Sequence, residues 1–269
     1  MRREEPSATK LNAEHREDYL RRMTTIAERA MDRLRGGRDD LHPVLWRLTT
    51  EQVARTLADF IDANIKLFSG RAERVPSYLE VSFGQRRRRG VSDELSSPDK
   101  LVLDLKDEEP ASIAGKIDRI DQVTGTPGGF VVVDYKTGKS LASAKQIERG
   151  TSLQLPLYVL AAERVLLKDE GARALSAELY GLREQKPKVL MRRTGSKDDE
   201  AEWTNLIETV VGCVGEYVGG IRRGEFPVFV REDQRCPAHC EFKRICRYSE
   251  RRALKKSEGW KPWMHRKKE

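Results

Sequence analysis

The chain has 269 residues, with 51 Lys and Arg against 43 Asp and Glu, and a formal net charge of +8. This length suits one large domain or two small ones and allows a sizeable core. The sequence contains no apolar stretch near the roughly 20 residues of a membrane span and no apolar signal-peptide segment at its N-terminus. A secreted or membrane protein is therefore not expected, and a cytoplasmic one is. The excess positive charge is compatible with an anionic partner such as nucleic acid.

Hydrophobic periodicity divides the chain into helices and strands. Thr49 and Gln52 form a capping box that predicts the start of the second helix. A glycine-rich turn over 125–129 predicts a hairpin. In chain order, we expect helices over 12–35 and 50–68, strands over 78–83, 101–105, 112–121 and 129–135, a mainly helical stretch over 142–168, a strand over 176–183 and a helix over 203–222. This order favours one α/β domain with a central mixed sheet flanked by helices.

The stretch from Gly115 to Lys136 carries the residues best suited to chemistry. Asp118 and Asp134 lie late in two strands that pair across the expected hairpin, and Lys136 shares a strand face with Asp134. Two converging carboxylates can hold a hard cation such as Mg²⁺. A nearby ammonium can hold an attacking water or stabilise charge on a phosphate, so the set suits metal-assisted phosphodiester hydrolysis. The alternative is a surface Asp134–Lys136 ion pair, with Asp118 as an ordinary turn residue.

Three ordered motifs resemble a known family. GKIDRID (115–121), VVDYKTGK (132–139) and QLPLY (154–158) are similar to the RecB-family branch of the PD-(D/E)XK nucleases, which includes the nuclease domains of RecB- and AddB-type helicase–nuclease complexes. EVSFG (80–84) matches the strand that usually precedes them. Within it, Glu80 occupies a common family position, and a structural ion pair is an equally good interpretation.

The resemblance covers about residues 40–250 and implies a restriction-endonuclease-like (PD-(D/E)XK) fold. The implied parts are an N-terminal helical part over 1–75, the nuclease core over 76–190, a C-terminal helix with a cysteine cluster over 191–250 and a basic tail over 251–269.

The resemblance also implies roles for residues in the motifs. Asp118 and Asp134 would ligate the metal, the backbone carbonyl of Tyr135 would complete the shell, and Lys136 would be the catalytic lysine.

A second implied group lies on the following helix. Gln154 and Tyr158, four residues apart on one helix face, match the family's Q-x-x-x-Y motif and would position DNA or the lysine. The alternative for Tyr158 is an ordinary core residue.

One metal ligand of the family has no clear counterpart. The family has a His or Glu on an apolar helix upstream of the two aspartates, usually after a glycine, and no G-x-x-x-H pattern occurs in this chain. His15 is the candidate, although its polar neighbours are typical of an exposed histidine, and His42, before a proline, is expected to be structural. Either the third ligand has diverged or the chain begins after it.

All four cysteines follow residue 212, which fits a cluster or metal site better than a disulfide framework. Cys236, Cys240 and Cys246 resemble the motif that binds an iron–sulfur cluster in the AddB-like branch, and a [4Fe–4S] cluster normally takes four thiolates. Three interpretations stay open: a cluster that lacks one ligand, a cluster completed by Cys213 or by a histidine such as His239, and a cysteine relic. Zinc held by the three cysteines and His239 is a lesser alternative. Cys213 lies mid-helix and is expected to be buried.

Two basic segments are candidates for DNA contact. The tail over 251–269, with eight Lys and Arg against two Glu, would neutralise phosphates, while Trp260 and Trp263 would stack on unpaired bases. The alternative is a solvated basic loop and a disordered tail. The candidate DNA-binding residues outside the tail are Arg86, Arg87, Arg88 and Arg89.

These expectations describe a Mg²⁺- or Mn²⁺-dependent deoxyribonuclease of RecB/AddB type, an exonuclease module of recombination and repair. Its partners would be DNA and a helicase subunit or domain, without a membrane. The alternative is an inactive nuclease-like module that binds DNA or serves as a scaffold in a helicase–nuclease complex, because its upstream ligand is gone.

Overall fold

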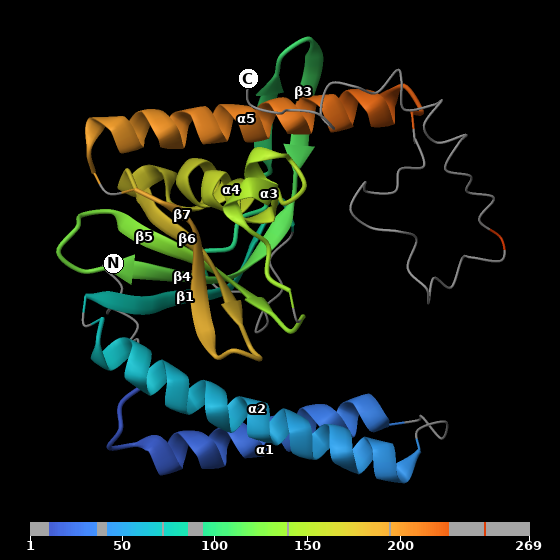
Figure 1. The fold of residues 1–269 in the computed structure, drawn as a ribbon, viewed down its shortest axis with the longest axis vertical. Coiled ribbons are helices and arrows are strands. Elements are labelled where there is room, and N and C mark those ends of the chain that lie inside the picture. The colour runs from blue at the N-terminus through green and yellow to red at the C-terminus, as the bar shows by residue number, and fades with distance from the viewer. Residues whose placement is uncertain are drawn as a thin grey trace.

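A five-stranded mixed sheet forms the centre of the molecule (Figure 1). The computed structural model describes residues 11–36, 42–71, 73–85, 94–138, 140–193, 195–225 and 245. The strands lie in the order β1 (Arg74–Phe83), β4 (Gly115–Val123), β5 (Gly129–Lys136), β6 (Arg173–Gly181) and β7 (Lys186–Arg192). β5 and β6 are parallel, and the other neighbours are antiparallel. The predicted α/β class with a mixed sheet is therefore confirmed.

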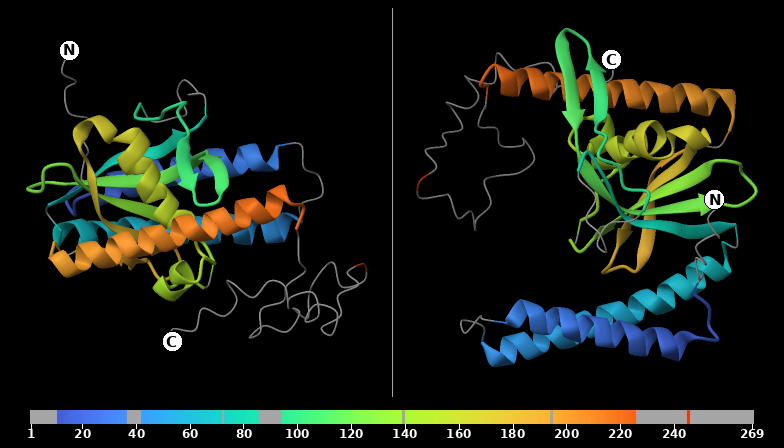
Figure 2. Two further views of the ribbon diagram at one scale, coloured as in Figure 1. Left: turned by 90° about the horizontal axis from the view of Figure 1, so that it is seen from above. Right: turned by 180° about the vertical axis from the view of Figure 1, so that it is seen from behind.

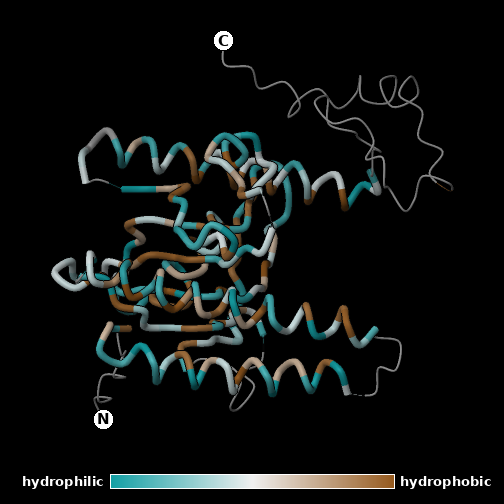
Figure 3. The backbone as a smooth tube through the Cα atoms, turned by 60° about the horizontal axis from the view of Figure 1, so that its bottom comes forward, coloured by the Kyte–Doolittle hydropathy of each residue, from teal (hydrophilic) through white to brown (hydrophobic). Residues whose placement is uncertain are grey.

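Strand β5 is central, and helices cover both of its faces. Val131 and Val133 face α2 (Pro43–Ser69), where Phe60 packs against them, whereas Val132 belongs to the larger core on the side of α4 (Gln154–Ala161). A strand buried on both faces reads as a continuous apolar run, as this one does. In Figure 3, hydrophobic segments recur along the central strands, while the peripheral helices alternate between hydrophobic and hydrophilic residues.

The helices form two layers (Figures 1 and 2). α1 (Arg16–Arg35) and α2 pair with each other on one side of the sheet. On the other side lie α3 (Ala144–Glu148), α4 and the long α5 (Lys197–Arg222). A separate hairpin of β2 (Leu101–Leu105) and β3 (Glu108–Ile113) packs against α5. The two short helical turns that link α4 to β6 cover Ala162–Leu166 and Lys168–Glu170.

The structure corrects the predicted start of the second helix. α2 begins at Pro43, not at residue 50, and His42 is its N-cap, with Nδ1 accepting a hydrogen bond from the Val44 backbone at 3.3 Å. Proline is well suited to the first helical position because its missing N–H needs no partner there. Thr49 lies inside the helix and donates to the Leu45 carbonyl at 2.8 Å, so it is no cap.

One strand prediction was wrong, and one strand was missed. The strand expected over 112–121 is two strands, since β3 ends at Ile113 and β4 begins at Gly115, where each pairs with a different partner. β7 was not predicted. Pro187 and three basic residues are not typical of a strand and hide its apolar alternation. They are tolerated because β7 lies at the sheet edge.

None of the helices in the described ranges has the length and apolar character that spanning a bilayer requires.

Candidate active site

The end of β5 presents two charged side chains toward α4. Asp134 and Lys136 share the strand face of buried Val132, so they point to the layer that contains α4. The Asp134 side chain is only 2% exposed, and its Oδ2 lies 2.5 Å from Lys136 Nζ. The lysine side chain is 36% exposed, which leaves its ammonium within reach of solvent and of a bound molecule.

Gln154 connects this pair to the first turn of α4. Lys136 Nζ donates to Gln154 Oε1 at 2.8 Å, and Gln154 Nε2 donates to Asp134 Oδ1 at 2.8 Å. Gln154 Nε2 also donates to the Tyr158 hydroxyl at 3.0 Å, as the four-residue spacing on a helix allows. The structure thus brings together four of the residues that the motifs single out.

Asp118 reaches the same region from the neighbouring strand. Arg119 pairs with Val133 in the β4–β5 ladder, so Asp118 is opposite Asp134. Its Oδ2 accepts a hydrogen bond from the Tyr135 backbone N–H at 2.8 Å.

Burial and neighbouring charges act on the Asp134 carboxylate. Burial raises the pKa of Asp134, the Lys136 ammonium opposes that shift, and the charge of Asp118 adds to it. Although Lys136 is close, Asp134 Oδ2 is a buried atom without a hydrogen bond of good geometry. Burial also raises the pKa of Tyr158, which keeps its phenol protonated.

The donor set fits a hard divalent cation. Asp118 and Asp134 offer carboxylate oxygens, and Mg²⁺ is commonly held by one or two carboxylates together with water and substrate phosphate. The Asp134 oxygen that lacks a directed hydrogen bond is the kind of atom that a cation would satisfy. In the described ranges, no group of three or more His, Cys, Asp and Glu residues could hold a metal.

The sequence profile of the PD-(D/E)XK nuclease superfamily matches residues 7–247. The chain belongs to this superfamily. A subunit of an ATP-dependent helicase/deoxyribonuclease from Carboxydothermus hydrogenoformans is 34% identical over 96 residues, which are 35% of this chain. The matched part is 8% of that relative's length. The RecB/AddB-type resemblance of the motifs is therefore confirmed, as is the PD-(D/E)XK fold.

Glu80, at a position common in PD-(D/E)XK nucleases of this branch, makes an ion pair with Lys116. It lies opposite Asp118, since its neighbours pair with Arg119 and Ile117 in the β1–β4 ladder. Its backbone has φ +55°, which is rare for a residue with a side chain and is found where surroundings impose it. The side chain of Glu80 therefore makes an ion pair, as the structural interpretation of this residue expects.

The upstream ligand typical of PD-(D/E)XK nucleases has no counterpart near Asp134 in the described residues. His15 is exposed at the start of α1, where its ring meets Tyr19 edge-on with centroids 6.3 Å apart. The adjacent Arg16 forms an ion pair with Asp62 of α2. Because α1 and α2 cover the opposite face of the sheet from Asp134, the structure does not bring His15 to the cluster.

The other predicted ligands and DNA contacts lie largely beyond the described ranges. Cys213 is buried in α5, as expected, with only 2% exposure. The remaining predicted residues outside the described ranges are Cys236, Cys240, Cys246, His239, Trp260, Trp263, Arg86, Arg87, Arg88 and Arg89.

Sequence reasoning missed a buried charged cluster behind the site. Arg119 and Asp121 flank the buried Ile120 in β4, and both side chains are at most 4% exposed. Charged residues at inward positions of an apolar strand were the available signal, because buried charges require partners.

Proposed function

We propose that this member of the PD-(D/E)XK nuclease superfamily is a Mg²⁺- or Mn²⁺-dependent deoxyribonuclease that acts as an exonuclease in recombination and repair. The observation that carries the proposal is the hydrogen-bonded set of Asp134, Lys136 and Gln154, with Asp118 on the adjacent strand. The name of the Carboxydothermus relative, a helicase/deoxyribonuclease subunit, supports DNA as the substrate and a helicase as the partner.

Each residue of the set has a proposed task. Asp118 and Asp134 would hold the cation, with the Tyr135 carbonyl as a further oxygen ligand. When bound, the cation supplies Lewis-acid stabilisation and lowers the pKa of a water molecule. Lys136 would stabilise the negative charge that develops on the phosphate, because its ammonium lies at the site with partial exposure.

Gln154 would fix the direction of Lys136 and Asp134 by contacting both. Tyr158, protonated over the working pH range, would support Gln154 and offer its hydroxyl to the DNA backbone.

A nuclease assay with labelled linear and circular DNA, single- and double-stranded, tests the proposal. Linear DNA should be degraded with Mg²⁺ or Mn²⁺ and not with EDTA, and circular DNA should persist. Lys136→Ala and Asp134→Ala should each lower the rate roughly 100-fold or more, as loss of a charge-stabilising group does. Lys168→Ala is the control and should match the wild type, because this exposed lysine lies just before the start of β6, at the other end of the β5–β6 pair from Lys136.

DNA binding without metal-dependent degradation would contradict the enzyme and favour a scaffold module. The observation that favours the scaffold function is that no third acidic or histidine ligand joins the two aspartates among the described residues.

A further inference from the structure

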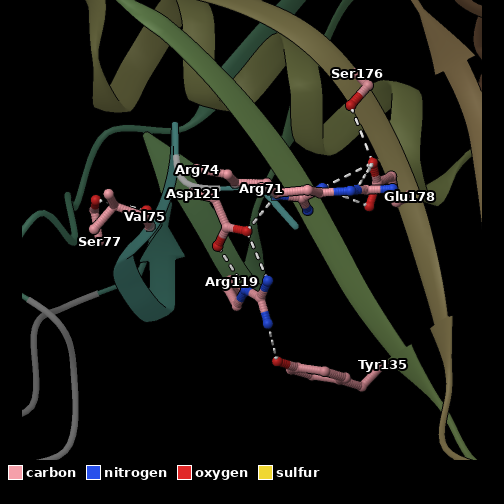
Figure 4. Close-up of polar contacts among 9 residues, drawn as sticks. All are labelled: Arg71, Arg74, Val75, Ser77, Arg119, Asp121, Tyr135, Ser176 and Glu178. Carbon is pink, nitrogen blue, oxygen red and sulfur yellow. Dashed lines mark hydrogen bonds and ion pairs between the residues drawn. The ribbon is translucent and has the colours of Figure 1, made fainter. Parts of the chain in front are cut away.

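A buried charged cluster connects β1, β4 and β6 (Figure 4). Its Arg119 lies over Phe68 of α2, on the face of the sheet opposite Asp134. Arg74 Nε donates to Asp121 Oδ2 at 2.6 Å, and Arg74 Nη1 donates to both oxygens of Glu178 at 3.0 and 2.9 Å. Arg119 completes the cluster with two hydrogen bonds to Asp121, at 2.5 and 2.6 Å. These two arginines and two carboxylates are all at most 5% exposed, and the more exposed Arg71 also pairs with Glu178, at 3.7 Å.

Arg119 extends this cluster to the end of β5. Its Nη1 donates to the Tyr135 hydroxyl at 2.8 Å, and its guanidinium lies over the Phe68 ring, 5.3 Å from the centroid. Burial is the largest influence on the pKa of Arg119 and would lower it, but the hydrogen bonds and charge attraction of Asp121, together with the contact to Tyr135, raise the pKa overall. The guanidinium therefore stays charged and uses both ends of its planar fork, which a lysine cannot reproduce.

Tyr135 connects the two faces of the sheet. Its ring packs on the α2 side, edge-on to Phe60 and Tyr180 at 5.7 Å from each, while its backbone N–H donates to Asp118 Oδ2. By holding the Tyr135 hydroxyl, Arg119 therefore also restricts the Tyr135 peptide group, whose N–H binds the Asp118 carboxylate. Such partners behind a metal ligand set its orientation.

We propose that Arg119 is a positioning residue that orients Asp118 through Tyr135. Arg74 fixes Asp121, and Asp121 fixes Arg119. Arg119 fixes the Tyr135 side chain, and the Tyr135 backbone fixes Asp118. This inference rests on the proposed metal-dependent nuclease function, because the orientation of Asp118 affects activity only if Asp118 holds the metal.

Tyr135→Phe is the sharpest test, since it removes only the hydroxyl contacted by Arg119 and keeps the aromatic packing. Mn²⁺ affinity of the full chain, measured by titration calorimetry, should fall about 10-fold, the lower end of what loss of a partner behind a ligand costs. In nuclease assays at saturating Mn²⁺, kcat should fall while KM for DNA stays constant, because DNA binding is not altered.

Tyr180→Phe is the matched control. Tyr180 belongs to the same aromatic cluster, but its hydroxyl contacts Asn64 and Gln185, at 3.2 and 3.3 Å, in place of Arg119. This variant should retain wild-type Mn²⁺ affinity and kcat, whatever it costs in stability. Equal losses in the two variants would overturn the inference, because they would reflect general loosening of the cluster.

Asp118→Ala separates failure of this inference from failure of the proposed function. If Mn²⁺ affinity is unchanged in Asp118→Ala, there is no metal site to position and both proposals fail. If Asp118→Ala abolishes Mn²⁺ binding and Tyr135→Phe behaves like the wild type, only the positioning role is overturned. Arg119→Lys, if it folds by circular dichroism, should reproduce the effect of Tyr135→Phe, and unchanged Mn²⁺ affinity in that variant would contradict the inference.

Discussion

Gln154 is central to the candidate site because its amide carries both an acceptor and a donor. The oxygen receives the Lys136 ammonium, and the nitrogen donates to Asp134 and Tyr158. No charged side chain of similar size could serve all three partners, since a carboxylate has no proton to donate and an ammonium has no lone pair.

Gln154→Glu tests this requirement with almost no change in shape. The new carboxylate would keep the Lys136 contact but face Asp134 Oδ1 with a like charge, so we expect nuclease activity to fall about 10-fold or more. The melting temperature should change little because position 154 is exposed. Steady-state nuclease kinetics and thermal unfolding measure the two effects.

Gln122→Glu is the control for that substitution. Gln122 is also exposed and donates to the Tyr78 hydroxyl at 3.3 Å, but it lies near the β4–β5 turn, away from Asp134. Equal activity in the two glutamate variants would show that position 154 has no special role.

The loop between α3 and α4 docks on α5 through a glycine. Gly150 has φ +71°, and its carbonyl accepts a hydrogen bond from the Tyr217 hydroxyl at 2.9 Å. A Cβ at this position would lie 2.6 Å from Cys213 Sγ, so the loop approaches the Cys213 side chain too closely for any residue but glycine. This contact explains why Cys213 is part of the core.

Gly150→Ala should destabilise the fold for two separable reasons. The left-handed backbone should cost about 1–2 kcal/mol, and overpacking against Cys213 should add about 1–3 kcal/mol. Gly171→Ala isolates the first cost, since Gly171 has φ +58° and open space around a Cβ. Urea unfolding gives both free energies, and equal losses would exclude a close contact at Gly150.

Elements with strong periodicity could be predicted, and their boundaries could not. The β4–β5 hairpin follows from a glycine-rich turn between apolar strands. The break at Ala114 has no local signal, because residues on both sides of it suit strands and only pairing partners separate β3 from β4. β7 depends in the same way on a partner, β6, which the alternation of its own residues does not reveal.

Over the whole molecule, the candidate site could be predicted because its residues are close along the chain. Its contacts join residues at most 20 positions apart, within motifs that resemble a family. The buried charged cluster could not be predicted, because Arg74 contacts Asp121 and Glu178, which are 47 and 104 residues away along the chain. Hydrophobic periodicity contains no information about such distant pairs.

The whole-molecule charge of +8 leads to a prediction about the arginine run. Replacing Arg86, Arg87, Arg88 and Arg89 together with glutamine should weaken DNA binding and flatten its salt dependence. The slope of log K against log salt should fall by up to roughly 3 to 4 for duplex DNA, because each phosphate contact contributes about 0.9. Fluorescence anisotropy over a range of salt concentrations measures that slope.

A second quadruple variant removes the same charge from α1. It replaces exposed arginines on the layer opposite the candidate site, namely Arg21, Arg22, Arg29 and Arg33. Its salt slope should stay near the wild type. An equal change in both variants would mean that DNA responds to net charge rather than to the run at 86–89.

The long separation between Arg74 and Glu178 also bears on the order of folding. The hairpin and the start of α4 bring the site residues together over short loops, which close quickly and at low entropic cost. The Arg74–Glu178 contact closes a loop of 104 residues and must wait for β1 and β6 to join the sheet. We therefore expect Asp118 and Asp134 to come together early in folding. The buried charged cluster that contains Arg74 and Glu178 should form only later, when β1 and β6 have joined the sheet.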